Sequence, residues 1–147
     1  MTTKASTGLR NHMLTTGSLK AALDGGFLRL YSGVEPATAD AAIPGGSTLL
    51  LTVFSDNVAA GLNLAATAAD GFIEKSTQTW SGPVLATGTA TWFRFVAAAD
   101  TGALSTTQAR LQGSVARAGA DLNISSADLV AGAPQAVNYF TVALPAF

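Results

Sequence analysis

"TATWFRFVAA", residues 89–98, is the stretch of sequence that decides the fold. Successive side chains of a β-strand point to opposite faces, so Phe93 and Phe95 share one face while Trp92 and Arg94 share the other. This alternation predicts a strand whose phenylalanines face a hydrophobic core. The second face mixes a large aromatic ring with a cation, which is unusual for a surface that meets only water.

The same two-residue period recurs along the chain, interrupted by turn residues. "FLRLYS" at 27–32 places two leucines on one face and Phe27, Arg29 and Tyr31 on the other. The remaining strand candidates are 47–55, 62–67, 72–76, 77–81, 109–115, 120–125 and 136–144. Roughly eight or nine short strands with regular turns predict an all-β domain of the β-sandwich or jelly-roll type.

Only the N-terminal residues are expected to be helical. Ser18 is placed to cap a short second helix that ends at Gly25. The sequence therefore predicts a short helical arm over residues 1–25 and a β-sandwich domain over residues 26–147. Because such short helices are weak alone, we expect the arm to pack on a neighbouring subunit or capsid surface.

Composition limits the function. A chain of 147 residues with 12% charged residues is one domain with about half the usual charge, so we expect much of its surface to be covered in the working state. The net charge is −1 and the basic residues are scattered, so we expect no nucleic-acid partner. No long apolar segment predicts membrane insertion, and the absence of cysteine excludes disulfides and thiol chemistry.

The sequence offers little for catalysis. His12 is the only histidine and lies in the predicted helical arm, while Glu35 and Glu74 are the only glutamates. Most aspartates lie beside turn residues, where local hydrogen bonding explains them. Phosphate-binding, nucleophile-elbow and calcium-loop patterns are absent from the sequence. We therefore expect no enzyme activity, no catalytic residue, no cofactor and no metal.

The aromatic and cationic face favours a protein interface instead. Trp and Arg are enriched at interface hot spots, so we predict interface residues at Trp92, Arg94, Phe27, Arg29 and Tyr31. The simpler alternative is a half-exposed tryptophan with the arginine lying along it. On the interface reading, another polypeptide covers the Trp92 face. That polypeptide would be a second copy, in a dimer or trimer, or the capsid shell.

Four segments carry a resemblance to a known family: residues 8–33, 89–96, 109–126 and 137–146. They resemble small proteins of tailed bacteriophages and prophages that are encoded among virion structural genes. The resemblance implies a head decoration protein, also called a cement or minor capsid protein. Such a protein is made in the host cytoplasm and bridges major capsid protein subunits on the capsid surface. The resemblance implies no catalytic or ligand-binding residue.

Two other functions stay open at this point. One is a tail or baseplate component of the same virion. The other is a carbohydrate-binding receptor module on a fibre, with Trp80 or Trp92 as the aromatic platform for a sugar. Jelly rolls serve each of these functions, so the fold class does not choose among them.

Overall fold

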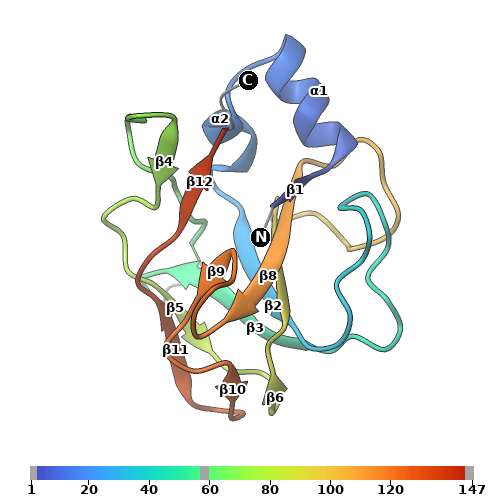
Figure 1. Cartoon of the computed structure of the whole chain (residues 1–147), viewed down its shortest axis with the longest axis vertical. Helices are drawn as coiled ribbons and strands as arrows, with labels where there is room; N and C mark the ends of the chain where they lie inside the picture. The colour runs from blue at the N-terminus through green and yellow to red at the C-terminus, as the bar shows by residue number, and fades with distance from the viewer. Residues whose placement is uncertain (1–2, 57–59, 145–147) are drawn as a thin grey trace.

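A computed structural model describes residues 3–56 and 60–144 (Figure 1). These residues form short helices near the N-terminus followed by strands, which confirms the predicted all-β class. The helices are α1 (Thr7–Thr15) and α2 (Leu19–Leu23). The strands are β1 (Lys4–Ala5), β2 (Phe27–Tyr31), β3 (Leu49–Ser55), β4 (Phe72–Glu74), β5 (Trp80–Pro83), β6 (Gly88–Thr89), β7 (Trp92–Val96), β8 (Arg110–Ala116), β9 (Leu122–Asn123), β10 (Asp128–Leu129), β11 (Pro134–Val137) and β12 (Thr141–Ala143).

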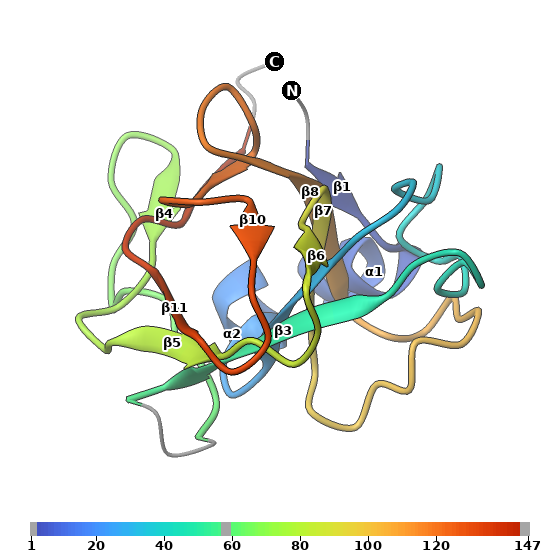
Figure 2. The same ribbon diagram turned by 90° about the horizontal axis from the view of Figure 1, so that it is seen from below.

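Most strands join one large sheet. Its antiparallel order is β1-β8-β7-β2-β3-β5-β11, and β9 adds to β8 in parallel. Two separate ribbons pair β4 with β12 and β6 with β10. Figures 1 and 2 show the β4–β12 ribbon, β5 and β11 on one side of β2 and β8, and long loops on the other side.

The register of the sheet gives it two different faces. Leu28 of β2 lies beside Phe95 of β7, and one residue further Arg29 lies beside Arg94. Residues opposite one another in neighbouring strands share a face. The row with Leu28 and Phe95 belongs to the hydrophobic core. The next row carries Arg29, Arg94 and Gln112 to the opposite face.

The N-terminal residues belong to the same core. β1 pairs with β8, and Leu9 and Leu23 are fully buried members of the core cluster. A Cβ added to Gly8 would lie 2.4 Å from the carbonyl oxygen of Thr107, so only glycine lets α1 pack this closely. The expectation that the N-terminal arm packs on a neighbouring subunit is wrong for residues 3–25, because their apolar side chains complete the chain's own core.

Serine caps begin both helices. The Oγ atoms of Ser6 and Ser18 each accept a hydrogen bond from the backbone N–H three residues later, which confirms the predicted cap at Ser18. Ser6 also connects α1 to the sheet. Its Oγ accepts from the N–H of Arg110 at 2.9 Å and donates to the carbonyl of Gln108 at 2.7 Å. One buried hydroxyl therefore starts a helix and fixes it to β8.

The two caps provide a matched test of this connection. Ser6→Ala should lower the free energy of unfolding by about 2 kcal/mol, because it removes the cap and leaves the buried N–H of Arg110 unpaired. Ser18→Ala removes only an exposed cap and should cost about 1 kcal/mol or less. Urea unfolding of both variants measures the difference. Equal losses would show that Ser6 acts as a cap alone.

Candidate functional site

The structure buries the predicted interface face inside the chain. Trp92 and Arg94 are 0% exposed and Tyr31 is also buried, whereas Phe27 and Arg29 are partly exposed. The indole of Trp92 stacks on the ring of Tyr31 with centroids 4.4 Å apart. Its Nε1 donates to the carbonyl of Ser32 at 3.2 Å. The partners of this face therefore come from the chain itself.

Residues 33–46, named here the covering loop, supply acceptors for Arg94. The Nη1 atom of Arg94 donates to the carbonyl of Ala41 at 3.0 Å. Nε and Nη2 both donate to the Oε1 atom of Gln112, at 3.0 and 2.6 Å. Gln112 in turn donates to the carbonyl of Pro36 at 2.8 Å. Because all these acceptors are neutral, burial lowers the pKa of Arg94 to about 10, and the charge of Arg110 adds to the effect.

Arg110 connects the sheet to the covering loop and to a second long loop, residues 97–109, between β7 and β8. It forms a buried ion pair with Asp100, with contacts of 2.6 Å from Nε to Oδ2 and 2.8 Å from Nη2 to Oδ1. Nη1 donates to the carbonyl of Ala39 in the covering loop, and Nη2 donates to the carbonyl of Ala103. Arg29 donates to the carbonyl of Asp100 at 2.9 Å. Arg29, Arg94 and Arg110, named here the arginine cluster, thus join β2, β7 and β8 to the loops.

This geometry corrects the sequence prediction. The expectation that another polypeptide covers the Trp92 face is wrong, because the covering loop already does so. Phe27 and Arg29 stay predicted interface residues, since part of each side chain is exposed. The hydrogen bonds of the arginine cluster go to acceptors within the chain, so the cluster holds the loops on the sheet. Trp80 and Trp92 are both buried, so neither can serve as a sugar platform.

Substitution of Trp92 measures how much the packing of the buried Trp92 face contributes to the free energy of unfolding. Trp92→Ala should lower the free energy of unfolding by about 3–5 kcal/mol, as should Phe93→Ala, because each opens a cavity in a packed region. Tyr139→Ala removes an aromatic ring that is 83% exposed and should change the stability by less than about 0.5 kcal/mol. Urea unfolding provides the measurement. A loss below about 1 kcal/mol for Trp92→Ala would contradict a buried Trp92 face.

The buried ion pair should make stability depend on acidic pH. Burial opposes the charge on Asp100, but hydrogen bonds from Arg110 and the Gly102 N–H, with the charge of Arg110, lower its pKa below the ordinary value. A lowered carboxyl pKa stabilises the fold above the unfolded value of about 3.9, and this stability is lost as the pH falls through the folded value.

Asp100→Asn tests this dependence. The variant should lose about 3 kcal/mol at pH 7, because it leaves Arg110 buried without an anion. Its stability should also fall less than that of the wild type between pH 5 and pH 2, because one shifted carboxyl is gone. Denaturant unfolding at several pH values checks both points. An acid dependence identical to that of the wild type would exclude Asp100 as a contributor.

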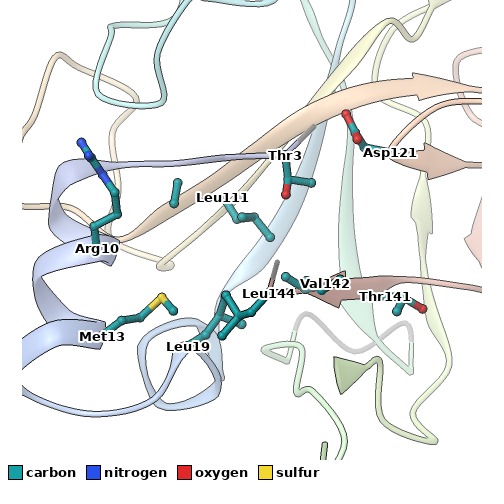
Figure 3. Close-up of a pocket in the computed structure, with 11 residues that line it drawn as sticks. Thr3, Arg10, Met13, Leu19, Leu111, Asp121, Thr141, Val142 and Leu144 are labelled. Atoms are coloured by element: carbon teal, nitrogen blue, oxygen red, sulfur yellow. The ribbon is translucent and has the colours of Figure 1, made fainter. Parts of the chain in front are cut away.

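A groove on the surface is the best candidate for a binding site (Figure 3). It lies between β1 and β8 on one bank and β12 on the other, and has a volume of about 520 Å³. Figure 3 shows Met13 and Leu19 at one end, Asp121 at the other, and Leu111 facing Val142 across the middle. We name this feature the β12 groove.

The banks of the β12 groove are strands with one unpaired edge. β1 is the last strand of the large sheet, and β12 pairs only with β4 among the described strands. A second hollow of about 300 Å³ continues along β12 past Asn123 and Tyr139. A third hollow, of about 370 Å³, extends between α2 and β4. The groove thus follows the whole length of β12.

Arg10 and Asp121, the charged residues of the groove, both bond to neighbours in the chain. Arg10 donates to the hydroxyl of Thr7 at 3.0 Å, and one carboxylate oxygen of Asp121 accepts from the N–H and hydroxyl of Ser114. His12 lies on α1, outside the groove lining. Within residues 3–56 and 60–144, no group of three or more His, Asp or Glu side chains is arranged to hold a metal ion. In the same ranges, neither helix is long and apolar enough to cross a membrane.

The fold and groove define an all-β protein with an open, strand-lined surface groove. No protein-family model matches the chain, and no curated protein or solved structure is significantly similar to it. The resemblance to tailed-phage virion proteins therefore rests on residues 8–33, 89–96, 109–126 and 137–146 alone.

The residues of the β12 groove were not identified from the sequence. Ala5, Leu111 and Val142 are small or aliphatic residues of ordinary strands, and they meet only through pairings between distant parts of the chain. The one sequence signal is "TVAL" at 141–144, a strand segment without a charged residue. An uncharged edge strand is open to pairing with another chain.

Proposed function

We propose that this protein is a non-enzymatic virion structural protein, namely a head decoration or cement protein that bridges major capsid protein subunits. It would be made in the host cytoplasm and would act on the capsid surface. The observation that carries an assembly role is the β12 groove, an apolar surface lined by two unpaired strand edges. The assignment to a phage head comes from the family resemblance.

Exposed apolar side chains around the groove support a protein partner. Leu144, which lines the groove next to β12, is 59% exposed, and Phe72 of β4 is 50% exposed. Phe72 is in register with Ala143 in the β4–β12 ribbon. Exposed apolar residues gathered at a groove are typical of interaction surfaces. On a chain with 12% charged residues, little charge opposes association there.

The arginine cluster supports a compact, self-sufficient subunit. Since the chain covers its own Trp92 face, it needs no partner to complete that region. Such a rigid subunit could sit at many equivalent positions of a shell, where modest contacts act together through avidity. Self-association into a dimer or trimer would add further contacts and is part of the proposal.

Two alternative functions can be distinguished from the proposed one. Copy number distinguishes a tail or baseplate component, and the role of one exposed aromatic ring distinguishes a carbohydrate-binding module. A tail or baseplate component would occur in a few copies per particle rather than in hundreds. A carbohydrate-binding module would need a platform other than the buried tryptophans. Tyr139 is such an exposed ring, with Asn123 and Asp121 beside it. Loss of glycan binding in Tyr139→Ala, with particle occupancy unchanged, would favour this alternative.

Particle occupancy tests the proposal directly. In purified virions we expect the protein in numbers comparable to the major capsid protein. Leu144→Asp should lower occupancy about tenfold at limiting protein concentration, because a buried carboxylate opposes docking. Leu104→Asp is the control, because Leu104 is 73% exposed on the loop at 97–109, away from the groove. A handful of copies per particle, or equal loss in both variants, would contradict the proposal.

A further inference from the structure

The outer edges of β1 and β12 display backbone groups to the same groove. In β1, the Ser6 N–H donates to the Arg110 carbonyl at 2.9 Å, and Ala5 is in register with Leu111. Hydrogen-bonded and non-hydrogen-bonded pairs alternate along antiparallel strands. The N–H and carbonyl of Ala5 therefore point away from β8. Ala5 also lines the groove, so this free edge borders it.

The same reasoning orients β12. The Phe140 carbonyl accepts from the Lys75 N–H at 2.8 Å, and the Leu144 N–H donates to the Gly71 carbonyl at 3.1 Å. Between these pairs, the alternation turns the N–H and carbonyl groups of Thr141 and Ala143 away from β4. Both residues line the groove.

We propose that the β12 groove binds an extended polypeptide segment of a partner protein, which adds as a β-strand between β1 and β12. The partner's identity rests on the proposed assembly function, but the binding mode rests on the groove alone. The free edges of β1 and β12 both carry backbone donors and acceptors. An extended peptide between them can form hydrogen bonds with both edges, because its own N–H and carbonyl groups alternate in direction. A sugar or an acyl chain offers no such alternating pattern.

The dimensions of the groove agree with a short strand. Neighbouring strands lie about 4.8 Å apart, packed sheets about 10 Å apart, and each residue advances about 3.3 Å, so one strand residue fills roughly 160 Å³. The 520 Å³ groove therefore holds roughly three residues, which is the length of β12. The hollow beside Tyr139 allows the segment to extend along β12.

The residues that line the β12 groove determine which side chains the added segment, named here the guest strand, can carry. Leu111 and Val142 face one another across the middle, and Met13 and Leu19 close one end (Figure 3). Side chains of the guest strand that point into the middle of the groove would therefore be apolar and uncharged, because a buried charge would find no partner among Leu111, Val142 and Met13. Natural edge strands are protected by charges or proline, and β12 carries neither in residues 141–143.

A synthetic peptide, acetyl-TVTVTV-amide, provides the probe for the full-length protein. We expect saturable binding tighter than about 1 mM in an NMR titration. Intermolecular contacts should reach Ala5 on one bank and Thr141 or Ala143 on the other. Hydrogen exchange of the Thr141 and Ala143 amides should slow at least tenfold in the complex. A peptide with the same side chains but alternate N-methyl groups should lose this binding, because it cannot pair with one of the edges.

Ala143→Pro tests the edge in the protein. Proline lacks the N–H of residue 143, which is turned away from β4. The variant should therefore keep its pairing with β4 and its unfolding transition, whereas peptide binding should fall at least tenfold. Ala143→Val is the matched control, because it keeps the N–H and should bind as the wild type does. Unchanged binding by Ala143→Pro would overturn strand addition.

Other occupants give different results, and each would overturn the proposal. Equal binding of the N-methylated peptide would show a simple apolar pocket. Protection of the groove amides that grows with protein concentration, without peptide, would identify a second copy as the occupant. Absence of binding at millimolar peptide would reject strand addition while leaving the decoration function to the particle-occupancy measurement, so the two failures are distinguishable.

Discussion

The ion pair between Arg110 and Asp100 is the interaction on which the arrangement of this molecule depends. Three strands bring arginines to one face of the sheet, and such a face could not be buried without acceptors. Asp100 supplies a carboxylate, and backbone carbonyls of Ala39 and Ala41 in the covering loop supply further acceptors. Loop and sheet thus stabilise each other: the covering loop supplies hydrogen-bond acceptors to the polar face, and the face gives an otherwise irregular loop a fixed position.

This arrangement divides the molecule into a closed side and an open side. On the closed side, aromatic stacking, cation–π contact and hydrogen bonds place Trp92 and Arg94 beyond the reach of solvent. On the open side, the β4–β12 ribbon stands apart from the large sheet and leaves unpaired edges. Rigidity on one side is compatible with recognition on the other, because an edge that is already ordered loses less conformational entropy when it binds.

Local patterns in the sequence predicted the class of fold well. The alternation in residues 89–98 identified β7, and Ser18 and Gly25 marked the limits of α2, with Gly25 at a positive φ of 82°. The segment 136–144 was predicted as one strand but divides into β11 and β12, which belong to different sheets. The two-residue strands β1, β6 and β10 were missed, because so short a segment has no measurable period.

Neither the burial of Trp92 and Arg94 nor the β12 groove could be predicted from the sequence, and the reasons are physical. The partners of Arg94 and Arg110 include carbonyls of Ala39 and Ala41, and every residue has a carbonyl, so the sequence holds no signal for them. Low charge led us to expect that partners cover much of the surface, which stays a prediction, and it holds no signal that the cover of the Trp92 face belongs to the same chain. The groove depends on the separation of β1 and β12, which only tertiary structure sets.

The attachment of Ser6 to Gln108 and Arg110 also constrains how the chain is made. These bonds join residues 102 and 104 positions apart. β1 and α1 are made before β8, so they cannot dock until synthesis has passed Arg110. Pairings between such distant residues slow folding, and the apolar side of α1 is exposed meanwhile. With few charges to keep nascent chains apart, prompt synthesis of β8 becomes a condition for a soluble product.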